Sequence, residues 1–178
     1  MRVEHGRPSD PTGRAPQELA VYDLLDRLEI SYERVDHAAA FTMQDCEAID
    51  RVLAPAAVCK NLFLCNAQKS DFYLLMLRAD KKLKTKVLSA QIGSARLSFA
   101  PEEHLPALLG LIPGSVSVLG LMNDRAGRVR LLIDQDLLSS EWVGCHPCVN
   151  TASLRLRIVD LLECFLPAVG HDYRTVQL

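Results

Sequence analysis

Hydrophobic positions recur with two different periods along the chain. Over residues 21–28 apolar side chains return every three or four positions, as on one face of a helix, and Pro16 stands where such a helix begins. Residues 31–36 instead alternate like a strand, and residues 42–54 return to the helical period. The first third of the chain is therefore predicted as helix, strand and helix.

Residues 58–65 are an apolar, strand-like run with Lys60 and Asn61 in the middle. Alternation puts Lys60 on the same face as Val58 and Leu62, and Asn61 on the other face. Two polar residues inside a buried strand need partners on both faces. Lys60 either reaches solvent at the rim of a sheet or points into a cavity where it meets an anionic or strongly polar group.

The rest of the chain mixes strands with short helices. The pattern predicts a hairpin partner at 71–77, a helix ended by Gly93, further strands at 96–99, 129–134 and 153–157, and a last helix ended by Pro167. We therefore expect an α+β fold, with one domain over residues 16–178 and a mixed, curved, barrel-like sheet flanked by helices. Residues 1–15 are polar and aperiodic, which predicts a flexible N-terminal arm.

Composition and charge narrow the class of protein. The 178 residues are 49% hydrophobic and 24% charged, which is ordinary for a globular domain. No apolar run reaches about 18 residues, and no signal-peptide core opens the chain, so we expect a cytoplasmic protein without a membrane partner. The net charge of −2 means that any contact with nucleic acid is a local basic patch.

Four lysines within six residues form the most basic stretch: Lys81, Lys82, Lys84 and Lys86. One interpretation is the solvated entrance of a helix, and the other is a patch that contacts the phosphates of tRNA.

Other motifs offer little chemistry. Cys145 and Cys148 have the spacing of a thiol oxidoreductase or half a zinc site, but a β-alternating segment follows them and no second cysteine pair exists. Residues 114–118 lack the serine and the final glycine of a nucleophile elbow. We expect neither a metal nor another cofactor, and any reaction must be undemanding or assisted by its substrate.

Three segments in register carry a resemblance: residues 58–64, residues 114–124, and His146-Pro147 with Asn150-Thr151. Together they resemble the YbaK/prolyl-tRNA synthetase editing-domain family, above all its free-standing Ala-tRNA(Pro) deacylase branch, ProXp-ala or PrdX. The resemblance implies hydrolysis of the ester that joins alanine to the 3′ adenosine of tRNA(Pro). Such an ester is already activated, so the protein supplies mainly placement and electrostatics. A prolyl-tRNA synthetase partner is compatible with it.

The resemblance also implies roles for individual residues. Lys60 would hold phosphate or ribose oxygens, Asn61 would orient the strand or the substrate carbonyl, and Gly114 would let the backbone approach the substrate. His146 would either contact the aminoacyl end or brace its loop. Residues assigned to a small amino-acid pocket are Phe41, Met43, Val116, Ser117 and Asn150, although apolar members are equally explained as core and Asn150 as a loop brace.

Two alternatives stay open. The family pattern continues the glycine loop with proline and an aromatic residue, whereas this chain has Val118 and Leu119, so a cysteine- or serine-sized amino acid of the sister branches remains an option. A module that binds aminoacyl-tRNA or a synthetase without hydrolysis is the second alternative.

Overall fold

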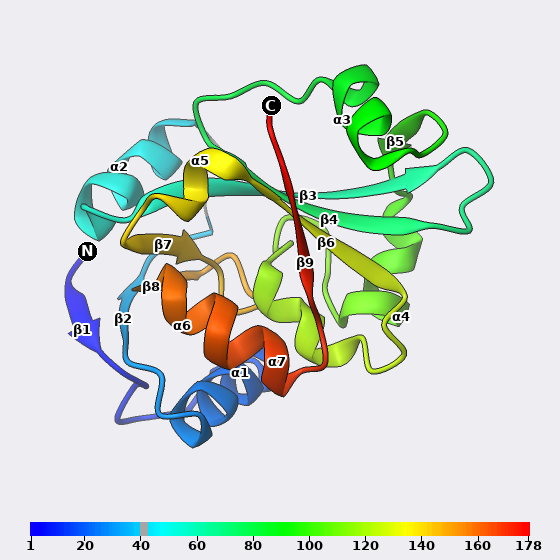
Figure 1. The fold of residues 1–178 in the computed structure, drawn as a ribbon. Helices are drawn as coiled ribbons and strands as arrows, with labels where there is room; N and C mark the ends of the chain where they lie inside the picture. The colour runs from blue at the N-terminus through cyan, green and yellow to red at the C-terminus, as the bar shows by residue number, and fades with distance from the viewer. Residues whose placement is uncertain (40–42) are drawn as a thin grey trace.

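The computed structural model describes residues 1–39 and 43–178, in which nine strands form one curved sheet (Figure 1). Its order is β1-β2-β8-β7-β3-β4-β6-β9, with β5 paired to β3. The strands are β1 Val3–His5, β2 Tyr32–Asp36, β3 Ala57–Asn66, β4 Phe72–Arg78, β5 Leu97–Phe99, β6 Val129–Asp134, β7 Trp142–Cys145, β8 Ala152–Arg157 and β9 Tyr173–Val176. Parallel and antiparallel pairs are mixed, and the described part of the sheet stays open, with β1 and β9 at its ends.

Helices cover both faces of this sheet (Figure 1). They are α1 Pro16–Arg27, α2 Met43–Leu53, α3 Thr85–Ile92, η1 Glu102–His104, α4 Leu105–Leu109, η2 Val118–Asn123, α5 Gln135–Leu138, α6 Ile158–Asp160, η3 Leu161–Phe165 and α7 Leu166–Ala168. The main core joins one face of the sheet to α1, α4, η2 and the last helical stretch. On the other face α3 and α2 each cover a smaller apolar cluster. The predicted α+β class and curved sheet with flanking helices are confirmed.

The long strand β3 links the two halves of the sheet. It pairs antiparallel with β4, so that Lys60 lies opposite Leu77 and Asn61 opposite Met76. Met76 belongs to the main core, whereas Leu77 belongs to the cluster under α3. Lys60 and Asn61 therefore lie on opposite faces of the sheet, as the alternation predicts.

The segment predicted as a flexible N-terminal arm, residues 1–15, includes one short strand. Residues 3–5 add a strand to the edge of β2, and Arg14 forms ion pairs with Glu18 and Asp36. Three residues of strand carry too little alternation to be recognised in a sequence. At the other end, β9 adds to β6 in parallel, and three of its four residues are exposed, so the sequence shows no alternation there.

None of the described helices has the length and apolar character needed to cross a membrane.

Candidate active site

The candidate site lies where two parallel strands separate. β3 and β7 pair only at Ala57 with Val143 and at Val58 with Gly144. Lys60 and His146 each stand two residues beyond that last pair, one on each chain segment. By alternation Lys60 keeps the face of Val58. The imidazole of His146 lies 3.3 Å from the hydroxyl of Ser153, on the face where Val35 packs against α2. The ammonium and the imidazole are thus brought to the same side of the sheet.

A polar brace fills the gap between the separating strands. The backbone amide of Val118 donates to Oδ1 of Asn61 at 3.1 Å, and the hydroxyl of Ser117 donates to the carbonyl of His146 at 2.6 Å. The same hydroxyl accepts from the amide of Leu119 at 3.2 Å, and Ser117 has no exposed surface. These bonds fix the start of η2 against both strands. Asn61 and Ser117 therefore hold the backbone at the start of η2 and after β7 in place.

The glycine loop that precedes this brace is a tight turn. The amide of Ser115 donates to the carbonyl of Ile112 at 3.1 Å, and its hydroxyl donates to the same oxygen at 2.8 Å. Gly114 within the turn is exposed and has φ +83°, a left-handed conformation that favours glycine. A Cβ placed there would lie 3.7 Å from Nδ2 of Asn150, so the turn and the loop after β7 lie close together.

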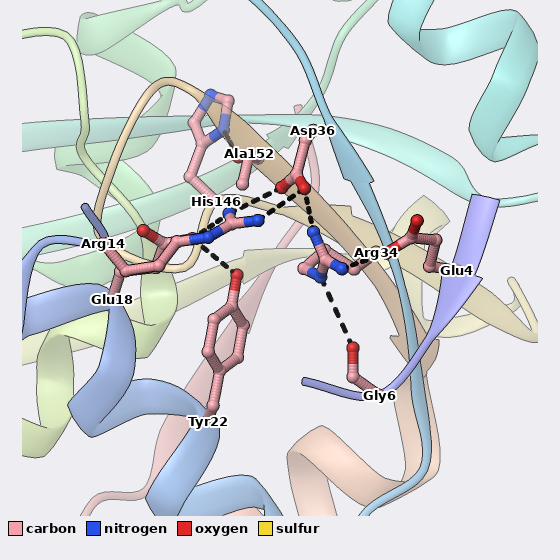
Figure 2. Close-up of polar contacts among 9 residues, drawn as sticks. All are labelled: Glu4, Gly6, Arg14, Glu18, Tyr22, Arg34, Asp36, His146 and Ala152. Atoms are coloured by element: carbon pink, nitrogen blue, oxygen red, sulfur yellow. Dashed lines mark hydrogen bonds and ion pairs between the residues drawn. The ribbon is translucent and has the colours of Figure 1, made fainter. Parts of the chain in front are cut away.

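His146 is half-buried in the loop that follows β7. Its Nδ1 lies 3.0 Å from the carbonyl oxygen of Ala152, and the two residues are drawn in Figure 2. Burial lowers the pKa of His146 below its usual 6.5, and the nearby His37 adds to this effect. The imidazole is therefore neutral at physiological pH, which suits an acceptor of hydrogen bonds more than an anion-binding cation.

Ion pairs hold the end of β2 beside the site (Figure 2). Arg34, which is 1% exposed, contacts both Glu4 and Asp36. Arg14 contacts Asp36 at 2.6 Å, and it contacts Glu18 at 2.8 Å. Next in the chain after Asp36 is His37, whose Nε2 lies 2.9 Å from the hydroxyl of Ser153. The cluster of ion pairs thus fixes the strand end from which His37 reaches the site.

The predicted lysine patch divides into two kinds of side chain. Nζ of Lys81 lies 2.9 Å from the buried Asp134 and 2.8 Å from Asp136, while its carbonyl accepts from Nζ of Lys60 at 2.8 Å. The ammonium of Lys81 is therefore already paired with two carboxylates. By contrast Lys82, Lys84 and Lys86 are exposed.

A pocket of about 460 Å³ opens beside these exposed lysines. Its lining comprises Thr85, Lys86, Ser89 and Arg96, at the start of α3 and just before β5. Two of its four residues are cations, so the region presents positive charge around a hollow in the surface.

The structure describes only some of the other residues predicted to form the amino-acid pocket. Phe41 lies outside the described residues, as does the side chain of Met43. Val116 is half-buried and packs against the main core. His37 and Ser153 could not be predicted as site residues, because nothing in a single sequence indicates that residues 116 positions apart share a hydrogen bond.

Cys145 and Cys148 lack the features of a redox-active cysteine pair. Cys145 ends β7 instead of opening a helix, and burial raises the pKa of both thiols, to about 12 for Cys148. Both therefore stay protonated at neutral pH. Among the side chains that the structure describes, no group of three or more potential ligands is placed to hold a metal ion.

Comparisons with known proteins identify the type of domain. The family profile described as the aminoacyl-tRNA editing domain matches residues 37–164. The prolyl-tRNA editing protein ProX of Acetoanaerobium sticklandii is 35% identical over 159 residues, which cover 89% of this chain and 96% of that protein. Prolyl-tRNA synthetase associated domain-containing protein 1 of Mus musculus is 32% identical over 152 residues, covering 83% and 88%.

Solved structures agree on the fold. A structure described as a candidate trans-editing enzyme for prolyl-tRNA synthetase superposes with a TM-score of 0.68 at 18% identity, covering 92% of this chain and 97% of that one. The crystal structure of hypothetical protein APE2540 gives the same TM-score over 88% and 97% of the two chains.

Proposed function

The chain belongs to the aminoacyl-tRNA editing domain family, and from this premise we propose that it is a hydrolase that removes alanine from mischarged tRNA(Pro). The observation that carries the proposal is that Lys60 and His146 each stand two residues beyond the last pair of the separating strands β3 and β7, in a chain 35% identical to a prolyl-tRNA editing protein. The ammonium and the neutral imidazole suit a substrate that joins a phosphodiester backbone to an aminoacyl ester.

Lys60 is the group proposed to hold the tRNA end. An ammonium is a compact point charge that binds phosphate or ribose oxygens without demanding a planar partner. Its Nζ donates to the carbonyl of Lys81, which directs the side chain along the surface toward the loop before α3. A bound 3′ adenosine at Lys60 would then bring the ester to the side of the sheet that carries His146.

The ester itself needs placement more than a strong nucleophile. The neighbouring ribose hydroxyl helps to position the attacking water, and the protein contributes orientation and electrostatic stabilisation. In this proposal Gly114 lets the backbone approach the substrate carbonyl, while the neutral His146 accepts a hydrogen bond from the aminoacyl end or from water. Asn61 and Ser117 hold these elements in place, and Val116 and Asn150 border the loop.

Selection against proline follows from size. The aminoacylation site of a prolyl-tRNA synthetase cannot strongly reject alanine, because a few missing methylenes change the binding free energy by only about 1–3 kcal/mol. A second site with walls too close for the proline ring removes the error. In this proposal Phe41 and Met43 belong to those walls, and a prolyl-tRNA synthetase in contact with the domain supplies the mischarged tRNA.

The proposal is tested by single-turnover deacylation of Ala-tRNA(Pro), Cys-tRNA(Pro), Ser-tRNA(Pro) and Pro-tRNA(Pro). We expect alanine to be released fastest and proline to be spared. Lys60→Met should lower the rate by roughly 10- to 100-fold, the size of a lost charge-assisted hydrogen bond. Lys69→Met is the matched control, because Lys69 is exposed at the far turn of the β3–β4 hairpin.

The outcomes separate the alternatives. Faster release of cysteine or serine than of alanine would assign the chain to a sister specificity with the same reaction. If tRNA binds but no ester is cleaved above the spontaneous rate, the domain is a non-catalytic binding module. Equal rates for Lys60→Met and Lys69→Met would remove Lys60 from the mechanism.

A further inference from the structure

His37 and Ser153 form a hydrogen-bonded chain with His146 that no comparison assigns. Nε2 of His37 lies 2.9 Å from the hydroxyl of Ser153, which in turn lies 3.3 Å from Nδ1 of His146. The two imidazole centres are 6.4 Å apart. The three side chains come from the end of β2, from β8 and from the loop after β7, so their meeting depends on the pairing of β8 with both neighbours.

Two backbone carbonyls show which ring nitrogens carry a hydrogen. Nδ1 of His146 lies 3.0 Å from the carbonyl oxygen of Ala152, and Nδ1 of His37 lies 2.8 Å from that of Ala38. A carbonyl oxygen only accepts, so both Nδ1 atoms carry a hydrogen. In a neutral imidazole the Nε2 atom then has none and is an acceptor.

The hydroxyl of Ser153 completes the pattern. Because Nε2 of His37 is an acceptor, the Ser153 hydroxyl donates to it. Its oxygen is then free to accept the second branch of the hydrogen bond from Nδ1 of His146. Every group in the chain is satisfied by one assignment of hydrogens, which runs from His146 through Ser153 to His37.

We infer that His37 and Ser153 are positioning residues that hold His146 in the Nδ1-protonated tautomer and so keep its Nε2 free of hydrogen, as an acceptor for the substrate of the proposed reaction. The inference rests on the proposed function for its consequence, but not for the tautomer itself. Within the part of the chain that the structure describes, Nε2 of His146 takes no hydrogen bond from the protein, unlike Nδ1.

The charged and titratable surroundings favour this neutral state. Burial lowers the pKa of His146, and the neighbouring His37 lowers it further. The thiols of Cys145 and Cys148 stay neutral, because burial raises the pKa of each. The carboxylate of Asp36, next to His37, is already paired with Arg14 and Arg34. The charge of the Asp36 carboxylate is therefore compensated by two guanidinium groups.

The tautomer is measured directly by nitrogen-15 NMR of the imidazoles in the whole protein, without substrate. We expect His146 to be protonated at Nδ1 and bare at Nε2 in the wild type. In Ser153→Ala the carbonyl of Ala152 remains as the only acceptor for Nδ1, so we expect a measurable share of the Nε2-protonated form. Ser153→Thr keeps a hydroxyl and should restore the wild-type spectrum.

Activity provides the second readout. We expect Ser153→Ala and His37→Ala to lower kcat for Ala-tRNA(Pro) by about 3- to 10-fold with little change in KM, the size set by one neutral hydrogen bond. His37→Gln places an amide oxygen where Nε2 was and should recover part of the rate. Ser70→Ala is the matched control, because that hydroxyl also bonds two side chains, Asn66 and Asp71, at the far hairpin turn.

The NMR and activity measurements test the inference and the proposed function separately. Nε2 protonation of His146 in the wild type would overturn the inference whatever the activity. An unchanged tautomer and unchanged pH profile of kcat in Ser153→Ala would overturn it as well. If the tautomers behave as expected and no variant cleaves any ester, the inference about His146 stands and the proposed hydrolysis is wrong.

Discussion

Arg34 places a guanidinium inside the protein with only 1% of its surface exposed. A buried charge of this kind is tolerated only when partners compensate the lost hydration. Glu4 and Asp36 provide negative charge, and the carbonyl of Gly6 accepts a hydrogen bond at 3.4 Å. Two of these partners belong to the first six residues, so the N-terminal strand is tied to the centre of β2 by more than its backbone.

Asp36 makes the stability of this arrangement depend on pH. Hydrogen bonding to Arg14, followed by the contact with Arg34, lowers the pKa of Asp36 from its usual 3.8 to about 2. Because the folded-state pKa is lowered, its contribution to the free energy of unfolding is full above pH of about 4 and is lost as the pH falls towards 2. The side chain is 41% exposed, so we discount the contribution for screening to about 1 kcal/mol.

We therefore expect Asp36→Asn to lower the free energy of unfolding at pH 7 by about 1 kcal/mol and to remove this share of the acid dependence. The measurement is urea unfolding at several pH values between 2 and 7. Asp172→Asn, at an exposed position, is the control and should follow the wild type. A constant difference between Asp36→Asn and the wild type at all pH values would contradict the ion-pair explanation.

At the scale of elements, the turn that carries Gly114 links conformation to function. Both Gly114 and Gly127 have positive φ, +83° and +62°, and neither would bring a new Cβ closer than 3.7 Å to another group. Alanine at either position therefore meets conformational strain of about 1–2 kcal/mol without a steric clash. The two glycines differ in location: Gly114 adjoins the candidate site, whereas Gly127 lies in the turn before β6.

This pair gives a matched prediction. Gly114→Ala and Gly127→Ala should lower the free energy of unfolding by similar amounts, measured by thermal or urea unfolding. Only Gly114→Ala should also slow the deacylation of Ala-tRNA(Pro), by about 10-fold or more, since the loop backbone must approach the substrate. If both variants retain the wild-type rate, Gly114 is needed for the turn alone.

Elements with strong local patterns could be predicted, and those that depend on distant pairing could not. The β3–β4 hairpin and α1 follow directly from alternation and from helical period, and Gly93 ends α3 in the left-handed conformation expected of it. β7 could not be predicted, because Trp142–Cys145 is only four residues long and includes a glycine. Short edge strands such as β1 are stabilised by their partner instead of by their own sequence.

The candidate site shows the same limit. The resemblance pointed to Lys60 and His146 separately, but their common side follows only from the parallel pairing of β3 with β7. Likewise, alternation separates Lys60 from Asn61, yet it cannot tell that Asn61 accepts from the amide of Val118. Roles that act through a third residue, as with Ser117 and the carbonyl of His146, appear only when the chain is folded.

At the scale of the whole molecule, the distribution of charge matters more than its sum. The chain carries a net charge of −2, so a tRNA meets no general attraction. The exposed lysines Lys82, Lys84 and Lys86 stand together beside the pocket that Arg96 also lines. Lys60 is tied by hydrogen bond to Lys81 in the loop that leads to them. A tRNA end held at Lys60 would thus have its next phosphates directed to this patch.

Salt dependence distinguishes such a patch from a general effect of charge. Each phosphate contact adds roughly 0.7–0.9 to the slope of log affinity against log salt concentration. Replacing Lys82, Lys84 and Lys86 by alanine together should weaken tRNA binding, lower that slope by about 2–3, and leave the single-turnover rate at saturating protein unchanged. The measurement is tRNA binding and deacylation across a salt series, because phosphate contacts position the substrate without entering the chemistry.

The control must change net charge by the same amount elsewhere on the surface. Replacing the exposed Arg2, Lys69 and Arg125 by alanine removes three positive charges that lie outside the patch. Only the patch variant should show the lower slope of log affinity against log salt concentration. Counterion release requires contact with phosphates and is insensitive to charge that stays in solvent. Equal losses in the two triple variants would mean that net charge alone governs the encounter. In that case the lysines are the solvated entrance of α3, the other interpretation of the same four residues.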